Sequence, residues 1–364
     1  MIIRTYKYRI YPNKEQAEKI DYTLDLCRWL YNSALEQRIT AYKKHGKSIS
    51  YYEQQNELPQ LKKELPEFKE VYSQVLQDVL RRLDKAFKNF FRRLKQGERR
   101  AGFPRFQGKN RYRSITYPQA SRTPIKNNRI RLGKIGHVRI NLSRNIQGTM
   151  KTCTVVRKNG KYYVMITAED TEIRVLNLTG KVVGVDLGIS HLAITSDGKF
   201  YENAKHLRRS EKQLKRLQRT VSRRKKGSNR RRKAVELLAK KHEQIANQRA
   251  DTNHKISRKL VEQYDLIVFE DLNINGMVKN KHLAKSIYEV AWKQLIEFTQ
   301  YKAENAGKEV LLVNPYNTSQ KCFNCGEIVK KTLSERTHKC NNCGYTEDRD
   351  INAAKNILQL GLEY

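Results

Sequence analysis

The stretch CFNCGEIVKKTLSERTHKCNNCGYTEDRDINAAKNI, residues 322–357, contains two CxxC pairs. An acidic segment follows them directly, and its last residues begin a pattern that predicts a helix. The pairs are separated by 14 residues, one fewer than the usual range for a ribbon. A glycine follows each pair, as a tight turn around a metal requires. The pattern predicts a tetrahedral structural Zn²⁺ site, in which four thiolates leave no open position for catalysis. The predicted ligands are Cys322, Cys325, Cys340 and Cys343.

The other cysteines, Cys27 and Cys153, stand alone in the sequence. We expect both to be buried as small apolar residues, and we expect His338, between the two CxxC pairs, to lie on the surface. Paired cysteines of this kind favour metal thiolates in a reducing compartment over a disulfide framework. The start MIIRTYKYRIYP lacks the apolar core of a signal peptide, and no run of 18 apolar residues occurs. We therefore expect the protein to lie in the cytoplasm.

Three acidic residues occupy positions that are costly for an uncompensated charge. Asp186 lies within the apolar run VVGVDLG, Glu270 ends LIVFEDL, and Asp350 opens the last helix, 80 residues after Glu270 and 164 after Asp186. A divalent-metal site explains all three together, because Mg²⁺ prefers carboxylate and water oxygens. Two such ions about 4 Å apart can activate a water and stabilise a leaving oxygen in phosphodiester cleavage.

Two neighbouring acids compete for places in this site. Asp271 follows Glu270 directly, so on a strand the two side chains point to opposite faces. Asp348 lies two residues before Asp350 and is the main alternative for the third ligand. The residues alone leave the choice between Asp348 and Asp350 open.

The charge balance indicates a polyanionic partner. Lys and Arg number 74 against 37 Asp and Glu, a formal net charge of +37. Such a surplus disfavours a compact state by self-repulsion, and a nucleic acid would compensate it while releasing counterions. A basic protein of the ribosomal type is the simpler alternative, but isolated acids in apolar strands are unexpected there.

The first half of the chain has the pattern of a small β-barrel interrupted by helices. A strand over 2–11, closed by Pro12, places Tyr6, Tyr8 and Ile10 on one face, and Asn13 is the expected cap of a helix over 14–40. A second amphipathic helix is expected over 74–95. A basic loop over 97–126 contains aromatic residues that could stack on bases. Short strands follow near 128–132, 137–141, 152–157 and 161–168, the last two joined by Asn159-Gly160.

The second half alternates apolar strands with helices. KVVGVDLGI is the first strand and LAITS its hairpin partner. Residues 205–233 hold 15 Lys or Arg and one acid, and with the stretch to 262 they predict a basic two-helix hairpin broken at 226–228. A strand over 265–272, a helix over 284–306 and a strand over 310–315 come next. This order predicts an α/β domain built from separate segments.

These motifs together resemble the TnpB family, the OrfB-type proteins of insertion sequences that are ancestral to compact type V CRISPR effectors. The resemblance is carried by GVDLG, FEDL, PYNTSQKC with the CxxC pairs, and DRDINAAKN, and upstream by YKYRIYP, LQDVLRRLDKAFKNFF and GFPRFQ. It implies an α+β multidomain fold: a wedge-like β-barrel with a helical recognition insertion, and a discontinuous RuvC-like (RNase H-like) α/β nuclease domain carrying a zinc ribbon. The implied ranges are 1–12 and 100–177 for the barrel, 13–99 for the recognition lobe, 178–318 and 345–364 for the nuclease domain with its basic hairpin at 203–262, and 319–344 for the ribbon that binds target nucleic acid.

The resemblance also implies an activity. Family members bind a guide RNA made from the transposon end and cleave complementary double-stranded DNA beside a short transposon-adjacent motif. The implied Mg²⁺ ligands are Asp186, Glu270 and Asp350, the last chosen over Asp348 by the pattern Asp350-Ile351-Asn352. Gln77 is a candidate reader of an adenine edge in the adjacent motif. We expect a monomer on the RNA.

Three alternatives remain at this point. The chain could be a nuclease-inactive RNA-guided regulator of DNA, although its three acids are intact. It could be a transposase-type strand-transfer enzyme, which would use similar metals without a guide. It could also be a CRISPR-associated relative, which only the genomic neighbourhood would distinguish.

Overall fold

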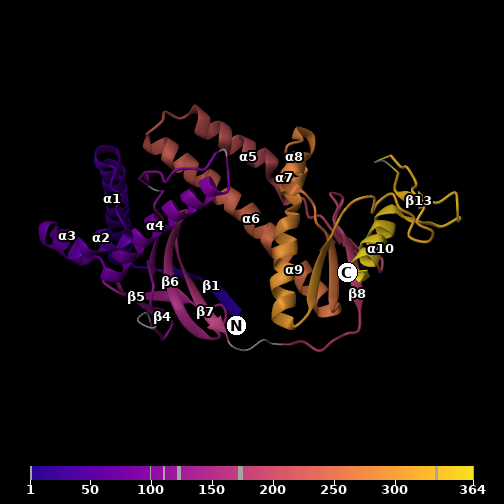
Figure 1. The fold of residues 1–364 in the computed structure, drawn as a ribbon, viewed down its shortest axis with the longest axis horizontal. Coiled ribbons are helices and arrows are strands. Elements are labelled where there is room, and N and C mark those ends of the chain that lie inside the picture. The colour runs from indigo at the N-terminus through magenta and orange to yellow at the C-terminus, as the bar shows by residue number, and fades with distance from the viewer. Residues whose placement is uncertain are drawn as a thin grey trace. The chain divides into compact units, whose positions relative to one another are not determined.

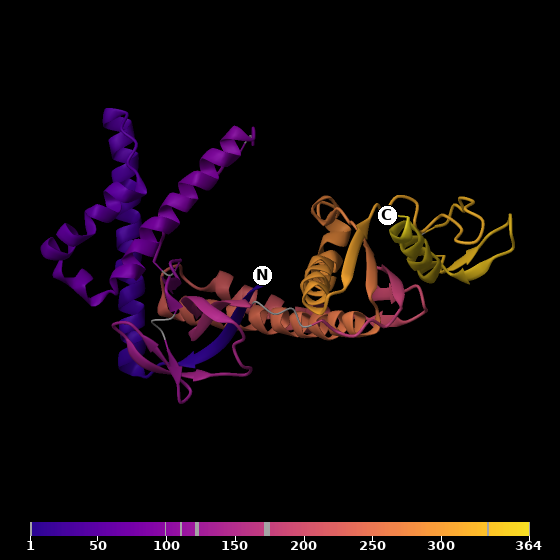
Figure 2. The same ribbon diagram turned by 60° about the horizontal axis from the view of Figure 1, so that its bottom comes forward.

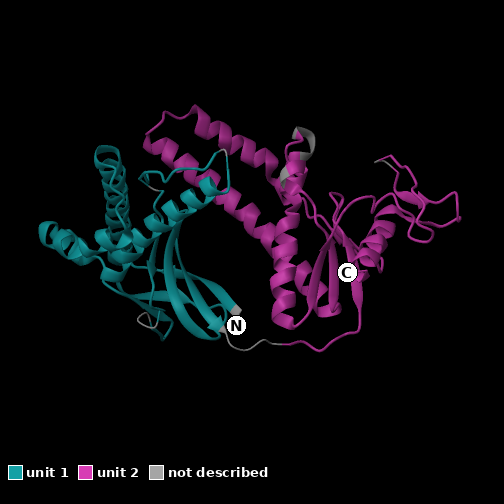
Figure 3. Cartoon of the chain, viewed as in Figure 1, with its two compact units in different colours: residues 1–172 teal, residues 173–364 magenta. Residues whose placement is uncertain are grey.

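The computed structural model describes residues 2–98, 100–109, 111–120, 124–170, 175–332 and 335–363. The chain divides into two compact units, residues 1–172 and 173–364 (Figure 3). This α+β, multi-unit organisation is the predicted one. The finer division of each unit into barrel, recognition lobe and ribbon stays a prediction.

Unit 1 is built on a seven-stranded antiparallel sheet in the order β2-β6-β7-β1-β5-β4-β3, which Figure 1 shows curled. The side chains of Tyr6, Tyr8 and Ile10 are buried, so the predicted alternation of β1 is confirmed. Asn159 and Gly160 both have positive φ, as the predicted tight hairpin requires. The strands are β1 (Ile2–Tyr11), β2 (Ser114–Tyr117), β3 (Ile125–Lys126), β4 (Arg129–Leu132), β5 (Gly136–Asn141), β6 (Thr149–Lys158) and β7 (Lys161–Asp170).

Helices inserted between β1 and β2 pack on this sheet. Asn13 caps the first helix through a capping box with Gln16, as its sequence position predicts, and the left-handed Gly46 ends it. Arg82, on the last long helix, donates to Ser114 and Thr116 of β2. The helices are α1 (Lys14–His45), α2 (Tyr51–Asn56), α3 (Leu58–Glu64), the short 3₁₀ helix η1 (Pro66–Glu70) and α4 (Ser73–Lys95).

The aromatic residues of the basic loop divide into two groups. Tyr112 and Tyr117 are buried in the unit 1 core, so they cannot stack on bases. Phe103 and Phe106 are exposed, and Phe103 also packs edge-on against two phenylalanines of α4. A role in base stacking is therefore wrong for Tyr112 and Tyr117 and stays a prediction for Phe103 and Phe106. Residues 99, 110 and 121–123 of this loop lie outside the described residues.

Unit 2 contains a five-stranded sheet in the order β10-β9-β8-β11-β12. β8, β11 and β12 are parallel, and β9 is antiparallel to both of its neighbours. In chain order this is 3-2-1-4-5, the RNase H-like topology. The strands are β8 (Val182–Asp186), β9 (His191–Thr195), β10 (Phe200–Glu202), β11 (Leu266–Glu270) and β12 (Glu309–Val313).

Helices cover both faces of this sheet, and Figure 2 shows the length of α6 in the predicted basic hairpin. The helix expected over 284–306 is two helices. Ala291 adopts a left-handed conformation between them, and the buried Trp292 then donates to the carbonyl of Gly188. The helices are α5 (His206–Arg223), α6 (Asn229–Gln263), α7 (Ile274–Met277), α8 (Lys281–Val290), α9 (Trp292–Ala306) and α10 (Arg349–Leu362).

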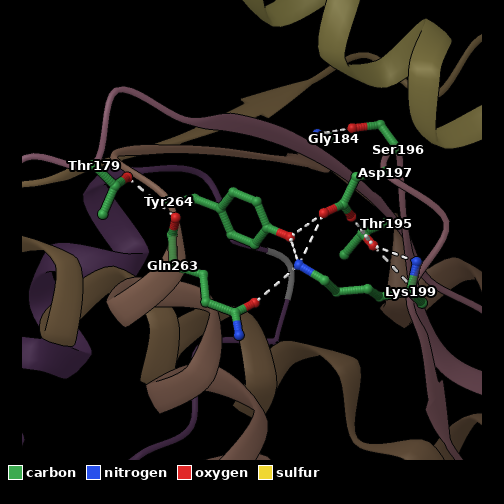
Figure 4. Close-up of polar contacts among 8 residues, drawn as sticks. All are labelled: Thr179, Gly184, Thr195, Ser196, Asp197, Lys199, Gln263 and Tyr264. Atoms are coloured by element: carbon green, nitrogen blue, oxygen red, sulfur yellow. Dashed lines mark hydrogen bonds and ion pairs between the residues drawn. The ribbon is translucent and has the colours of Figure 1, made fainter.

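A polar cluster ties the turn between β9 and β10 to the end of α6 (Figure 4). Tyr264 donates to Asp197 at 2.6 Å, and the Lys199 ammonium lies 2.7 Å from the Tyr264 hydroxyl and 2.9 Å from Asp197. Thr195 donates to the other oxygen of the Asp197 carboxylate. The hydrogen bonds hold Asp197 as an anion and lower its pKa although burial opposes this. The polar groups of the cluster hydrogen-bond to one another, so we assign the cluster a structural role.

The last helix, α10, approaches the sheet closely at two glycines. A Cβ atom on Gly184 of β8 would lie 2.0 Å from the carbonyl oxygen of Ala354 and 2.6 Å from the amide nitrogen of Leu358. A Cβ on Gly361 would similarly meet Val268 of β11 at 2.4 Å. Glycine at both points sets the distance between α10 and the sheet, and through it the position of Asp350.

We predict that Gly184→Ala displaces α10. The new methyl group meets backbone atoms that cannot rotate away, so the overpacking should cost about 3 kcal/mol or more of unfolding free energy. Thermal or denaturant unfolding measures this loss. Gly102→Ala is the control, because its Cβ would meet nothing within 4 Å and its φ is not positive. Equal stability of the two variants would contradict the close packing of α10.

Candidate metal centres

Asp186 and Glu270 lie at the carboxyl ends of adjacent parallel strands. In the β8–β11 register, Val185 pairs with Phe269, so Asp186 and Glu270 follow as the next pair. Val185 and Phe269 face the core shared with α6 and α9. Because side chains alternate, Asp186 and Glu270 point to the opposite face, where α10 packs. β11 ends at Glu270, and the next residue, Asp271, is exposed; the face to which its carboxylate points stays a prediction.

Asp350 reaches the same edge of the sheet from the first turn of α10. Its carboxylate accepts from Arg349, at 2.9 Å from Nε, and pairs with Arg336 at 3.4 Å. The competing Asp348 is the N-cap of α10 and accepts from the backbone amides of Asp350 and Ile351. The carboxylate of Asp348 is therefore engaged in the cap, while that of Asp350 is close enough to Asp186 to raise its pKa.

The three carboxylates influence one another electrostatically. The pKa of Asp186 is raised well above its ordinary value, first by burial and then by the negative charges of Glu270 and Asp350. Burial also raises the pKa of Glu270, against a hydrogen bond from Thr318 that lowers it. The three are close enough to repel, but as a set they are spread beyond 4.8 Å in this structure. A cluster of hard oxygen donors with this repulsion suits Mg²⁺.

This repulsion has a pH-dependent consequence. A carboxyl group whose pKa is raised in the folded state binds more protons there than in the unfolded chain, so it lowers stability as the pH rises above its ordinary pKa of 3.8. In Mg²⁺-free buffer we therefore expect Asp186→Asn to melt at a higher temperature than the unmodified protein at pH 8. The gap should shrink as the pH falls toward 5. A gap that is constant or widens on acidification would contradict the raised pKa.

The four cysteines converge as the sequence predicts. All four sulfur atoms lie within 4.8 Å of one another, and among the described residues no other group of three or more His, Cys, Asp or Glu side chains is so close. The Cys322–Cys343 and Cys325–Cys340 sulfur distances are 3.7 and 3.6 Å. A disulfide would need about 2.05 Å, whereas tetrahedral ligands 2.3 Å from Zn²⁺ lie about 3.8 Å apart.

The two turns that carry the cysteines are alike. Gly326 and Gly344 both have positive φ and donate to the carbonyls of Cys322 and Cys340. Hydrogen bonds from Asn324 and Tyr345 lower the pKa of Cys343 to about 6, which favours the metal-binding thiolate. Two short strands, β13 (Thr337–Lys339) and β14 (Thr346–Asp348), join the second turn to α10.

The expectation of a surface position for His338 is wrong. Its side chain is fully buried, because β13 alternates and turns Thr337 and Lys339 outward instead. Lys331 contacts its Nδ1 atom. His338 thus fills the small interior of the ribbon. Cys27 and Cys153 are buried as predicted.

On α4, the candidate base reader Gln77 is distinct from two arginines that bind within unit 1. Gln77 is partly exposed, and its role as a base reader stays a prediction. Arg82 is held by Asp78 and β2, and Arg93 donates to the carbonyl of Gly102.

Each helix in the described part of the chain is too short or too polar to cross a bilayer.

Fold and sites define the class: a two-unit α+β protein with an RNase H-like second unit, acids at its sheet edge and a four-cysteine ribbon. Three family models match the chain. They are OrfB_IS605, described as "Probable transposase", at residues 164–281; a Cas12f1-like TNB domain at 292–357; and an OrfB_IS605 helix-turn-helix domain at 1–47. The described part of this last range forms one strand and one long helix.

Two relatives match over nearly the whole chain. A protein of Streptomyces pristinaespiralis is 36% identical over 99% of this chain and 89% of its own length. One of Escherichia coli K12 is 33% identical over 99% of this chain and 92% of its own. Both are named "Putative RNA-guided DNA endonuclease", the second with the suffix InsQ. The chain belongs to the OrfB (TnpB) family.

The fold also matches a solved structure. CasPhi-2 bound to crRNA aligns with a TM-score of 0.50 and 11% identity, over 100% of this chain and 98% of that one. At this identity the likeness concerns the fold alone.

The sequence did not single out Thr318 or Asn356, and it gave Asn352 only as part of a motif. Thr318 is buried and donates to Glu270 at 2.5 Å. Asn352 and Asn356 are buried on α10 and bind the backbone before and at the first cysteine turn. Their i, i+4 spacing is a signal that could have placed them on one face.

Proposed function

We propose that this protein is an RNA-guided DNA endonuclease. It binds a guide RNA from the transposon end and cleaves complementary double-stranded DNA beside a short transposon-adjacent motif. The observation that carries the proposal is the convergence of Asp186, Glu270 and Asp350 at one sheet edge in a chain of net charge +37. The names of the two full-length relatives support it.

The three acids fit a Mg²⁺ site. Bound there, Mg²⁺ would supply a polarised water and neutralise negative charge at the phosphodiester. Glu270 is oriented by Thr318, and Asp186 is fixed by β8. Arg349 and Arg336 hold the Asp350 carboxylate and add positive charge beside the phosphate path. In the ribbon, the four cysteines would hold Zn²⁺ as a structural ion.

Sequence specificity would come from base pairing between guide and target, while the protein holds the heteroduplex by backbone charge. The basic hairpin of α5 and α6 offers the densest run of cations for this, with 15 Lys or Arg between residues 205 and 233. Gln77 on α4 remains the proposed reader of the adjacent motif.

Sequencing the RNA that co-purifies with the protein tests guide dependence. A discrete RNA that ends in a variable segment is the expected result. A protein that carries no specific RNA, and that remains active after RNase treatment, would contradict the proposal.

A strand-transfer enzyme is the second candidate, because the matched OrfB_IS605 model is described as a transposase. Such an enzyme would act at transposon ends without RNA. RNA-free protein incubated with transposon-end DNA and Mg²⁺ separates the two, since joined products would favour strand transfer and unreacted DNA the guided nuclease.

A further inference from the structure

One short segment of the chain contacts both metal centres. Residues 318–323, here called the bridge segment, begin at Thr318 and include the cysteine ligand Cys322. The left-handed Asn317 precedes the segment and starts a turn, in which the Lys321 amide donates to the Asn317 carbonyl at 2.9 Å. This turn redirects the chain from the sheet edge toward the ribbon.

At its first residue, the bridge segment holds one of the acids. The Thr318 hydroxyl donates to Oε1 of Glu270 at 2.5 Å, and both side chains are less than a tenth exposed. The hydroxyl also lies 3.2 Å from the carbonyl of Pro315, which fixes its rotamer. A buried carboxylate held by one hydroxyl takes its orientation from that hydroxyl.

At its far end, the bridge segment is clamped to α10. Asn352 donates to the carbonyl of Lys321 at 2.9 Å and accepts from the amide of Phe323 at 3.0 Å. Asn356 donates to the carbonyls of Thr318 and Lys321 at 2.8 and 2.7 Å. Both asparagines are at most 3% exposed, so these amide bonds form in a dry environment where losing them is costly.

These contacts connect Glu270, α10 and the four-cysteine centre through one segment. The bridge segment orients Glu270 and is hydrogen-bonded to α10, the helix whose first turn carries Asp350. It also includes Cys322, a ligand of the four-cysteine centre. A second contact runs in parallel: Lys355 of α10 binds Glu347 at 2.8 Å, next to the second cysteine turn. The ribbon therefore cannot shift without moving α10 and the hydroxyl that holds Glu270.

We propose that the bridge segment couples the ribbon to the nuclease site, with Thr318, Asn352 and Asn356 as positioning residues for Glu270 and Asp350. The inference rests on the proposed function of the three acids. It assigns the asparagine of the Asp350-Ile351-Asn352 motif to the ribbon backbone rather than to the metal. The four-cysteine centre is then required for divalent-ion binding at the three acids.

The test measures Mn²⁺ binding by electron paramagnetic resonance in the absence of nucleic acid, with Asp186→Ala as the blank. Thr318→Val removes the hydroxyl at constant shape, and Thr318→Ser restores it. We expect Thr318→Val and Asn352→Ala to weaken Mn²⁺ binding about 10- to 100-fold, the usual effect of losing a partner of a metal ligand. Thr318→Ser and the exposed control Gln359→Ala should bind like the unmodified protein.

A second measurement distinguishes a variant with an unfolded ribbon from a variant with displaced metal ligands. Cobalt substituted at the cysteines gives a thiolate absorption band that reports an intact ribbon. We expect Thr318→Val to keep this band while Mn²⁺ binding falls, and Cys322→Ser to lose both. Unchanged Mn²⁺ binding in Thr318→Val or in Cys322→Ser would overturn the coupling, as would equal defects in Thr318→Val and Thr318→Ser.

Failure of the proposed function has a different signature. If the unmodified protein binds Mn²⁺ no better than Asp186→Ala, the acids are not a metal site and the proposed function itself fails. If the unmodified protein binds and the bridge variants bind equally well, only the coupling fails.

Discussion

Asp186→Ala should abolish DNA cleavage while leaving the binding of guide RNA and target DNA nearly intact. Asp186 lies at the end of β8, and its pKa is raised by burial and by the charges of Glu270 and Asp350. Its removal takes a charge from the proposed Mg²⁺ site but leaves the basic residues proposed to bind the nucleic-acid backbone unchanged. A loss of at least about 10²- to 10³-fold in cleavage rate is the scale expected when a group that stabilises developing charge is lost. Plasmid cleavage under single-turnover conditions measures it.

Asp271→Asn is the matched control for that loss. This acid is adjacent to Glu270 in sequence and is exposed beyond the end of β11. It should cleave at close to the unmodified rate, and both variants should bind guide RNA equally well. Cleavage by Asp186→Ala at the rate of the control would contradict the assignment of the three acids as ligands of the catalytic metal.

Cys340→Ser should remove the zinc and with it the activity. Structural Zn²⁺ contributes about 10–16 kcal/mol to the folding of small cysteine-rich segments, more than a ribbon with one buried histidine and two short strands can replace. We expect one zinc per chain in the unmodified protein and none in the variant. Because the ribbon contacts α10, cleavage should fall with the zinc content.

Cys27→Ala provides the control, since Cys27 is buried in the core of unit 1, whereas the ribbon belongs to unit 2. It should keep its zinc and its activity. Metal analysis of purified proteins checks both variants. A folded, active Cys340→Ser protein without zinc would contradict a structural role for the ribbon.

Much of this architecture could be predicted from the sequence because local patterns agree with the final fold. The capped helix at Asn13, the Asn159-Gly160 hairpin and the break at 226–228 are local signals, and each is confirmed. The cysteine spacing predicted a cluster that the structure contains. The acids were candidates because a charge in an apolar strand is expensive, and the structure brings them to one edge.

What the sequence missed depends on contacts between distant segments. Nothing local marks Ala291 as a break, since alanine favours helices; the docking of Trp292 against Gly188 decides it. His338 looked exposed because polar residues usually are, but in a small ribbon strand alternation turned it inward. Thr318 is an ordinary loop threonine until β11 places Glu270 beside it.

Guided cleavage with exchanged guides tests the central claim most directly. Two plasmids carry different target sequences beside the same adjacent motif, and the protein is loaded with either guide in Mg²⁺. The account predicts that each guide directs cleavage only of its own plasmid, and that Asp186→Ala cleaves neither. Cleavage that ignores the guide, or that persists without RNA, would contradict it.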